Sequence, residues 1–204
     1  CTKSMKTRYV ESSEQMDFYG SSAAATVWIE NQNPPPENSN GNADFDVFNA
    51  GVSEERNGLL FAQGGLARMG ARGPQFSYDN ERPDHTIYQN PFWIASQPVT
   101  NGEFLEFIEA GGYSDFRHWL SAGWQWVCDN EIQQPLYWRK LDDNWQQWSL
   151  RGWIELDPSD FVAHLSYYEA DAFARFRKAR LALESEWEIA CNVAEARHLT
   201  FRRG

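Results

Sequence analysis

The sequence is poor in the residues that build disulfide frameworks, and it has no long apolar run. Its 204 residues include three cysteines, Cys1, Cys128 and Cys191, and no Cys-x-x-Cys pair. An odd number of dispersed cysteines argues against a disulfide scaffold, so we expect reduced thiols in a cytoplasmic protein. No run is long enough to cross a bilayer, and no apolar leader opens the chain. We therefore expect neither a membrane partner nor secretion.

Basic residues are also scarce. Lys and Arg number 18 against 29 Asp and Glu, which gives a net charge of −11 and a pI of about 4.8. Such a surface repels phosphate, and the basic clusters, such as residues 175–178, are short. Nucleic acid is therefore not expected as a partner.

Metal-binding and nucleophilic motifs are missing as well. The four histidines are His85, His118, His164 and His198, and no two are three or four positions apart. Neither a glycine-rich phosphate loop nor a Gly-x-Ser-x-Gly elbow occurs. The sequence thus predicts no catalytic residue and no metal ligand in this chain.

Tryptophan, in contrast, is abundant. Nine of the ten tryptophans fall between Trp93 and Trp187. Bulky aromatics at this density are typical of a core built from large side chains with few regular elements, and we expect them to pack rather than to stack on a ligand.

Residues 76–113 form the part of the chain with the clearest local signals. Short polar residues and a proline at 79–83 predict a turn, and β-branched and aromatic runs at 85–88 and 92–94 predict strands. Thr100 with Glu103 makes a capping box that predicts a helix ending at the glycines 111–112.

These residues carry a resemblance to a known family. The motifs are Asp-Asn-Glu-Arg-Pro-Asp-His at 79–85, Phe-Trp-Ile at 92–94 and the stretch 98–113, followed by 119–124, 135–139, 166–172, 180–181 and 184–188. Together they resemble the formylglycine-generating-enzyme-like, or sulfatase-modifying-factor, domain. Within it they are most similar to the ergothioneine sulfoxide synthases, which are iron-dependent enzymes that join hercynine to a cysteine thiol. The resemblance runs from about residue 60 to 190.

The resemblance implies an α+β protein with the C-type-lectin-like fold of that superfamily, truncated after its first half, with few regular elements and Trp-rich loops. We expect an unassigned N-terminal extension at 1–30 and a Pro/Asn-rich linker at 31–56, of which 31–43 is disordered or extended. The partial domain is expected at 57–190, and a divergent tail at 191–204.

Other elements are predicted around this centre. A short strand is possible at 27–29. A β-hairpin is expected from strands at 59–61 and 66–70, and a long, mostly irregular segment with short strands at 134–141 and 145–152 is expected within 113–161. Ser166 with Glu169 predicts a second capped helix, reaching residue 178.

A third helix is expected near residues 185–196. Relatives start it with Leu-Pro-Thr-Glu, whereas this chain has Leu-Ala-Leu-Glu at 181–184, so the capping threonine is lost. Ser185 with Glu188 offers a replacement capping box further on. We expect five aromatic residues to be mostly buried: Trp93, Phe104, Phe107, Phe173 and Trp187.

The motif residues are predicted to be structural. They are Asp79, Asn80, Glu81, Arg82, His85, Thr100, Asn101, Glu169, Glu184 and Trp187. The resemblance implies iron as the cofactor of the full-length enzymes, held by a His-x-x-x-His-x-Glu run on a separate helical bundle. This chain has no such run, so no cofactor is expected in it.

Three functions remain open. The first is the scaffold domain of a sulfoxide synthase, as a fragment or incomplete copy, whose partners would be an iron-binding helical-bundle domain or the missing half of the domain. The second is a non-enzymatic, C-type-lectin-like binding module. The third is a formylglycine-generating enzyme, which is disfavoured because Cys128 and Cys191 do not match the copper-binding cysteine pair of those enzymes.

Overall fold

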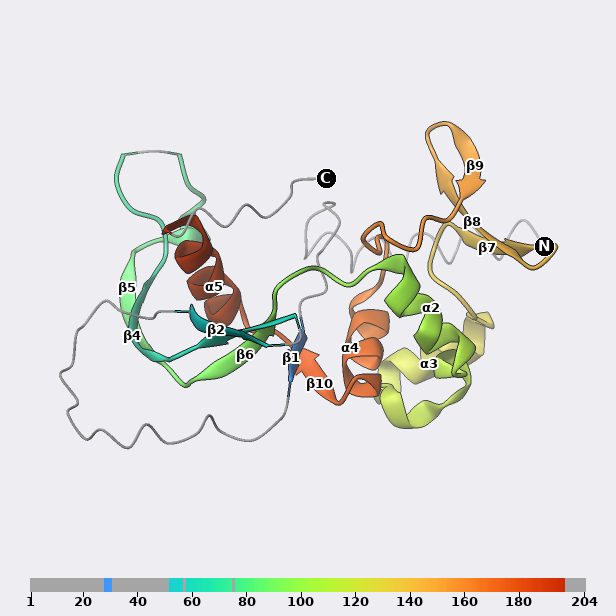
Figure 1. Ribbon diagram of the computed structural model, residues 1–204, viewed down its shortest axis with the longest axis horizontal. Helices are drawn as coiled ribbons and strands as arrows, with labels where there is room; N and C mark the ends of the chain where they lie inside the picture. Colours follow the sequence, from blue (N-terminus) through green and yellow to red (C-terminus); the bar gives the residue numbers. More distant parts are fainter. Residues whose placement is uncertain (1–27, 31–51, 57, 75, 197–204) are drawn as a thin grey trace. The chain divides into compact units, whose positions relative to one another are not determined.

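The computed structural model describes residues 28–30, 52–56, 58–74 and 76–196, with side chains over 58–74 and 76–191. The chain divides into two units (Figure 1). One contains Pro98–Leu181, and the other contains the described parts of Val27–Gln97 and of Ala182–Gly204. The helices and small antiparallel sheets place the protein in the α+β class. Residues 31–43, predicted to be disordered or extended, lie outside the described residues.

Two small sheets and one helix build the unit that contains residues 28–97. Strands β2 (Val52–Arg56), β3 (Leu59–Ala62) and β6 (Phe92–Ala95) form an antiparallel sheet in the order β2-β3-β6. Strands β4 (Gly65–Met69) and β5 (His85–Gln89) form a second, antiparallel pair. Helix α5 (Glu184–Ala196) contacts β4 and β2, and β1 (Trp28–Glu30) contacts β6.

The predicted hairpin between β3 and β4 is wrong. The chain does turn at Gly64, whose φ of 72° favours glycine, but β3 pairs with β2 and β6 while β4 pairs with β5. The sequence signal was a turn between two apolar runs, and such a signal does not say which strand each run pairs with. Strand β2 also occupies the last five residues of the range predicted as linker.

Three helices and one sheet build the unit that contains residues 98–181 (Figure 1). Helices α2 (Asn101–Glu109) and α4 (Tyr167–Phe176) contact each other, and α3 (Ser121–Asn130) follows two short 3-10 turns, η2 (Gly112–Ser114) and η3 (Phe116–His118). Strands β7 (Trp138–Leu141), β8 (Asn144–Ser149) and β9 (Gly152–Glu155) form an antiparallel sheet in chain order. The unit ends with β10 (Ala179–Leu181).

The capping signals placed two helices correctly. Thr100 accepts a hydrogen bond from the backbone N–H of Glu103 at 3.3 Å, and Glu103 accepts from the backbone N–H of Thr100 at 2.8 Å. Ser166 and Glu169 make the same reciprocal pair at the start of α4. Each box satisfies two backbone donors that a helix start leaves unpaired, so the predicted starts are confirmed.

Helix α3 was not predicted, because residues 113–161 were expected to be mostly irregular. Its alternation of Trp124, Trp126 and Val127 with polar residues is weakly periodic, and its N-cap, Leu120, makes no side-chain cap bond. Close packing specifies the helix instead. A Cβ added at Gly123 would lie 2.7 Å from the Cβ of Tyr168, so α3 approaches α4 at a position that only glycine fits.

Aromatic rings fill the core of the unit that contains residues 98–181. Phe104, Phe107 and Phe173 are fully buried, as predicted, and the Phe104 and Phe173 rings stack at 5.4 Å between centroids. Trp119 and Trp138 are also buried. The other unit buries Leu59, Phe61 and Ala62 of β3 with Phe92, Ile94 and Ala95 of β6 and Ile189 and Ala190 of α5.

One prediction about large aromatics fails in the unit that contains α5. Trp93 is mostly buried, as predicted, whereas Trp187 is 51% exposed. The buried side chains of the first two turns of α5 are Glu186, Ile189 and Ala190, and Trp187 lies on another face of the helix. The sequence pattern identified the helix but assigned Trp187 to the wrong face.

The predicted cap of the third helix is also wrong. Helix α5 begins at Glu184, and the backbone N–H of Trp187 donates to the carbonyl of Leu183 at 3.0 Å. Glu186 accepts from the backbone N–H of Leu183 at 2.7 Å, which is half of a capping box. Ser185 Oγ bonds Gln89 Oε1 at 3.0 Å instead. The helix therefore starts where the resemblance implied, although Leu183 has no side-chain acceptor.

Candidate functional site

The motif residues fall into two groups, one in each unit. Asp79, Asn80, Glu81, Arg82, His85, Glu184 and Trp187 belong to the unit with residues 28–97, and Thr100, Asn101 and Glu169 belong to the other. Within the described residues, no group of three or more His, Cys, Asp or Glu side chains is placed to hold a metal ion. The contacts of each group therefore indicate its role.

The loop at residues 70–84 is held by polar contacts. The 3-10 turn η1 (Asp79–Glu81) starts where Glu81 Oε2 accepts from the backbone N–H of Tyr78 at 2.7 Å. Arg82 donates through Nε to Ser77 Oγ at 2.5 Å and through Nη2 to the Gly73 carbonyl at 2.9 Å. Arg82 is thus a brace inside an exposed loop.

The two ends of this loop are tied down separately. Asp84 forms ion pairs with Arg68 and with Arg72, the latter at 3.3 Å. The backbone N–H of Gly70 donates to Glu188 Oε1 of α5 at 2.8 Å. His85 is exposed, and its Nδ1 lies 3.1 Å from the carbonyl of Pro83. A role of His85 in orienting this loop stays a prediction.

At the start of α2, Asn101 joins the helix to the loop at 157–160. It is buried, and its Nδ2 donates to the Asp157 carbonyl at 2.8 Å while its backbone N–H donates to the Asp160 carbonyl at 2.8 Å. Its Oδ1 is buried and has no hydrogen-bond partner among the described residues. Asn101 therefore fixes the position of a loop, and Thr100 beside it caps the helix.

Glu169 is the most unusual of the motif residues. Besides capping α4, its Oε1 accepts a hydrogen bond of 2.5 Å from the hydroxyl of Tyr113, and both side chains are buried. Burial raises the pKa of the Glu169 carboxyl, and the hydrogen bonds from Tyr113 and Ser166 offset part of that rise. Burial, with the neighbouring Glu169 charge, raises the pKa of Tyr113 well above 10. The pair keeps Tyr113 neutral and links η2 to α4.

A second polar cluster in this unit is partly exposed. Arg117 binds both carboxylate oxygens of Asp115 through Nε, at 2.8 and 3.0 Å, and His118 Nε2 lies 3.6 Å from Asp115 Oδ2. Hydrogen bonds from Arg117 lower the pKa of Asp115 to about 2. The His118 ring also contacts the rings of Phe107 and Phe176.

Iron, the cofactor that the resemblance implies, does not fit the described histidines. His118 faces one carboxylate, His164 packs its ring on Tyr137 at 5.0 Å, and His85 lies beside a backbone carbonyl. A mononuclear iron site needs a facial set of His and carboxylate ligands. These three residues do not provide such a set, and His198 lies outside the described residues.

Sequence reasoning missed two buried polar residues. Tyr113 carried no motif signal for its bond to Glu169, because the two are 56 positions apart. Glu186 is buried and closes the cap of α5. Glu186 lies three positions after Leu183, which is the spacing of a capping box. Leucine is not a capping residue, however, so the prediction placed the cap at Ser185.

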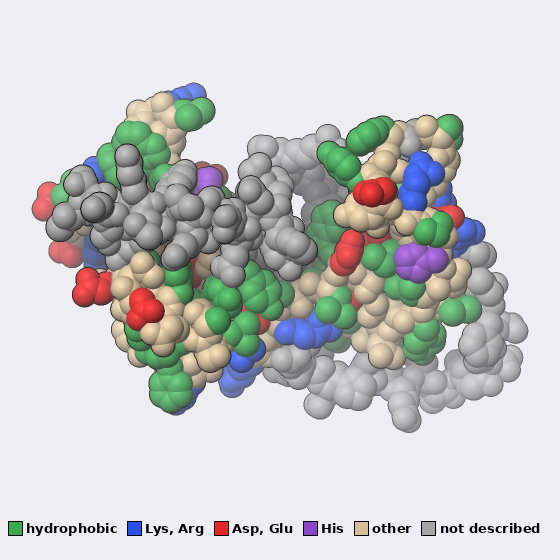
Figure 2. Space-filling model, turned by 180° about the vertical axis from the view of Figure 1, so that it is seen from behind, with side chains coloured by type: hydrophobic (Ala, Val, Ile, Leu, Met, Phe, Trp, Pro, Cys, Tyr) green, Lys and Arg blue, Asp and Glu red, His purple; other side chains and the backbone are tan. Residues whose placement is uncertain are grey.

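One exposed aromatic group was not predicted either. Trp148 and Trp153 face each other across β8 and β9 with ring centroids 5.4 Å apart, and the guanidinium of Arg139 lies 3.9 Å from the Trp153 ring centroid. Arg139 Nε donates to Gln146 at 2.9 Å. Figure 2 shows hydrophobic side chains on this hairpin, with a basic side chain at its tip.

The comparison with known proteins identifies the family of this chain. Residues 45–202 match the sulfatase-modifying factor enzyme 1-like domain, so the chain belongs to that family. The hercynine oxygenase of Mycobacterium tuberculosis is 42% identical over 116 residues, which are 56% of this chain and 27% of that enzyme. The hercynine oxygenase of Mycolicibacterium thermoresistibile is 39% identical over 117 residues, 57% of this chain and 25% of that enzyme.

A formylglycine-generating enzyme is a more distant relative. That of Thermomonospora curvata is 30% identical over 162 residues, 72% of this chain and 52% of that enzyme. The chain thus spans about a quarter of the hercynine oxygenases and about half of this enzyme. The described helices include none that is long and apolar enough to span a membrane.

Proposed function

We propose that this chain is the scaffold part of an ergothioneine-biosynthesis sulfoxide synthase, related to the hercynine oxygenases. The observation that carries the proposal is the identity of 42% over 116 residues with the enzyme of M. tuberculosis. The complete reaction joins hercynine to a cysteine thiol with iron and oxygen. This chain's share is to support the active site structurally, because its motif residues form caps, turns and ion pairs.

The proposal includes a fold, a partner and a compartment. The fold is the C-type-lectin-like arrangement of the superfamily, truncated, which membership of the family supports. The partner is an iron-binding helical-bundle domain or the missing half of the domain, since the chain spans about a quarter of the hercynine oxygenases. The compartment is the cytoplasm, which the dispersed cysteines support.

The test compares the chain alone with the chain mixed with the rest of a related enzyme. The purified chain is titrated with ferrous iron without oxygen, then mixed with hercynine and γ-glutamylcysteine in air and examined by mass spectrometry. We expect no stoichiometric iron and no sulfoxide. The same mixture is repeated with the remainder of the M. tuberculosis hercynine oxygenase, which is all of that enzyme outside the matched stretch, and we expect product there.

The outcomes distinguish between the possible roles of the chain. Product from the chain alone would overturn the scaffold role and direct attention to His85, His118 and His164 as ligands. An assembly that forms but yields no product would contradict the sulfoxide-synthase function. A control assembly without the chain measures any activity of the other polypeptides, and product at the same rate there would remove the chain from the reaction.

A second function, a non-enzymatic binding module, is favoured by the exposed group on β7–β9. Among the described residues, no carboxylate accepts from the terminal nitrogens of Arg139, while Trp153 stacks on its guanidinium and Trp148 is 48% exposed. A guanidinium held in this way suits a carboxylate beside an apolar ring. Benzoate, with benzamide as the neutral control, should quench tryptophan fluorescence in the native chain and not in Arg139→Gln. Equal responses to both compounds would count against the module.

A further inference from the structure

Tyr113 and Glu169 form a buried pair whose chemistry the proposed function does not use. The Tyr113 hydroxyl donates to Glu169 Oε1 at 2.5 Å, and the two side chains are 7% and 2% exposed. Oε2 of the same carboxylate accepts from the backbone N–H of Ser166. Oε1 is therefore the oxygen that can take the phenol proton, and a proton can cross such a hydrogen bond without a water molecule.

The cap of α4 does not require this arrangement. Glu103 closes the equivalent cap of α2 by accepting from the backbone N–H and the hydroxyl of Thr100, and Glu103 is only half-buried. Glu169 closes the cap of α4 from inside the core, where an ionised carboxylate is costly unless donors satisfy it. The burial of Glu169 against a phenol is thus additional to helix capping, and it indicates a second role for the pair.

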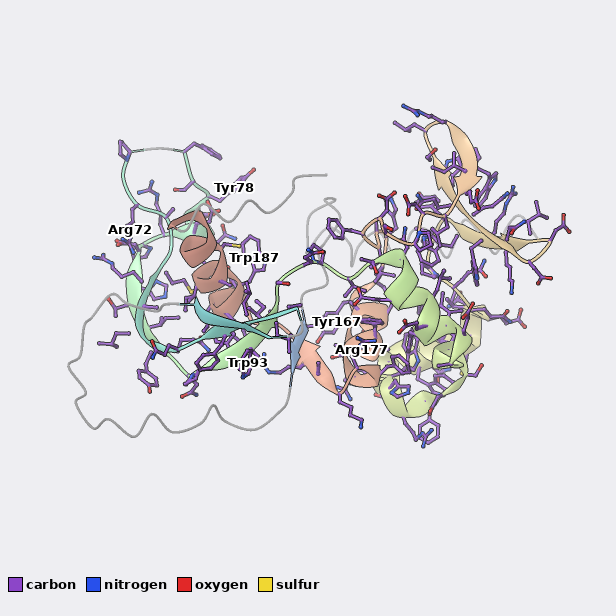
Figure 3. All side chains as sticks on the ribbon, viewed as in Figure 1. Arg72, Tyr78, Trp93, Tyr167, Arg177 and Trp187 are labelled. Carbon is purple, nitrogen blue, oxygen red and sulfur yellow. The ribbon has the colours of Figure 1, made fainter. Side chains whose placement is uncertain are left out.

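Two oxidisable rings lie side by side in this core. The Tyr113 ring packs on the Trp119 ring with centroids 5.4 Å apart, and Trp119 is also buried. Phe107 contacts both rings, at 5.7 and 6.4 Å between centroids. Figure 3 shows how densely side chains fill the unit around α2 and α4, the helices that supply Phe107 and Glu169. Tyrosine and tryptophan lose a single electron more readily than phenylalanine or histidine, and an electron passes easily between rings in contact.

We propose that Tyr113 is a redox-active tyrosine, which gives one electron to an oxidised Trp119 and its phenol proton to Glu169. A one-electron oxidant, such as an inorganic radical or an oxidised metal complex, first removes an electron from the Trp119 ring. Tyr113 then restores the electron of Trp119 while its O–H bond breaks and the proton binds Glu169 Oε1. The products are a neutral tyrosyl radical, a protonated Glu169, the original Trp119 and an oxidant reduced by one electron. The inference goes beyond the proposed function and does not depend on it.

Burial favours this step because the step neutralises the site. Before it the pair carries the charge of the Glu169 carboxylate, and after it both side chains are neutral, so the core loses a charge that it disfavours. Burial raises the pKa of the Glu169 carboxyl, which makes this carboxylate a better proton acceptor. Burial, with the neighbouring Glu169 charge, raises the pKa of Tyr113 well above 10, so the phenol keeps its proton until the electron leaves. The proton and the electron are therefore lost together.

The position of the pair also protects the radical. A tyrosyl radical decays by coupling with a second radical or by reacting with a solute, and both reactions need access to the ring. Tyr113 is 7% exposed, whereas Tyr88 is 68% exposed. An oxidising equivalent that reaches Trp119 therefore rests on Tyr113, where a small reductant such as a thiol meets it only slowly. The pair is a store for one oxidising equivalent.

The test oxidises the full 204-residue chain with azide radicals made by pulse radiolysis and follows the protein radicals by transient absorption. The variants are Tyr113→Phe, Glu169→Gln, Trp119→Phe and the matched control Tyr88→Phe, with circular dichroism to confirm folding. We expect tryptophanyl radical to convert to a long-lived tyrosyl radical in the native chain and in Tyr88→Phe. Tyr113→Phe should lose this radical, and Trp119→Phe should form it more slowly. Glu169→Gln should form it at least about a hundredfold more slowly, because the proton acceptor is removed.

A measurement on the native chain keeps the test independent of how the variants fold. Electron–nuclear double resonance of the frozen radical should show a strongly coupled proton that exchanges with deuterium, which is the proton held by Glu169. Four results would overturn the proposal. They are no long-lived tyrosyl radical in the native chain, its persistence in Tyr113→Phe, its equal loss in Tyr88→Phe, and no exchangeable proton beside it. An unchanged rate in folded Glu169→Gln or Trp119→Phe would also contradict the proposed route.

Discussion

The hydroxyl of Tyr113 and the carboxylate of Glu169 share a hydrogen bond of 2.5 Å, although the two residues are 56 positions apart. The other carboxylate oxygen of Glu169 accepts from the backbone N–H of Ser166 at 2.7 Å. One side chain thus closes the cap of α4 and attaches that helix to η2. The buried carboxylate has protein donors on both oxygens, which offsets the cost of removing it from water.

Replacing Tyr113 with Phe should destabilise the protein. The change removes the donor to Glu169 Oε1 and leaves that buried oxygen unsatisfied. The free energy of unfolding should fall by about 1–3 kcal/mol in urea titrations. Tyr88→Phe is the control, because Tyr88 is exposed and its loss should change stability by less than about 0.5 kcal/mol. Equal effects of the two variants would show that the buried bond contributes little.

The same tyrosine predicts a pH dependence. The pKa of Tyr113 is raised well above 10 in the folded protein, while the unfolded chain has an ordinary value near 10. The unfolded state therefore releases the proton first. This contribution to stability is complete below pH ~10 and is lost as the pH rises toward the folded-state pKa. Unfolding free energies measured between about pH 8 and 11 should fall more steeply for the native chain than for Tyr113→Phe. Parallel curves would contradict this prediction.

The pKa of the Asp115 carboxyl measures its interaction with Arg117 directly. Its pKa is lowered to about 2, chiefly by the hydrogen bonds from Arg117, so Asp115 stabilises the fold above its unfolded pKa and loses that effect as the pH falls toward 2. The carboxyl carbon resonance of Asp115 should titrate near 2 in the native chain. In Arg117→Gln it should titrate closer to the ordinary value of about 3.9. A midpoint unchanged by this substitution would rule out Arg117 as the cause.

Replacing Leu183, at the start of α5, with threonine should complete the helix cap and raise stability relative to alanine. Leu183 stands at the N-cap, where Glu186 already supplies the reverse half of a capping box. Leu183→Thr adds a hydroxyl that can accept from the backbone N–H of Glu186, and it should be more stable than Leu183→Ala by about 1 kcal/mol. The two variants remove the same apolar contact, so thermal unfolding of the pair isolates the cap. A difference near zero would mean that the introduced hydroxyl does not cap the helix.

Phe107 tests the aromatic core. It is fully buried, and its ring contacts those of Phe104, Tyr113, Trp119, Phe173 and Phe176. Phe107→Ala should lower the free energy of unfolding by about 3 kcal/mol, through lost contacts and the cavity left behind. Phe76→Ala is the matched control, since Phe76 is exposed. A loss below about 1 kcal/mol would show that neighbouring rings collapse into the space.

The local elements were predictable wherever a few neighbouring residues decide them. The capping boxes of Thr100 and Ser166 located α2 and α4, because a side-chain oxygen satisfies a backbone N–H only three residues away. The runs at β5 and β6 were equally clear from their composition and their flanking prolines. The family, too, was evident from spaced motifs in the right order, and the match over residues 45–202 confirms it.

Tertiary structure decided the features that depend on distant partners. The strands beside Gly64 pair with β6 and β5 rather than with each other, and α3 is held against α4 by the close approach of Gly123 to Tyr168. The bond between Tyr113 and Glu169 and the exposure of Trp187 also depend on distant parts of the chain. Local sequence determines which hydrogen bonds a helix end or a strand can make by itself. The covered side of a helix and the pairing of buried groups depend on chain segments tens of residues away. A local sequence pattern contains no information about those segments.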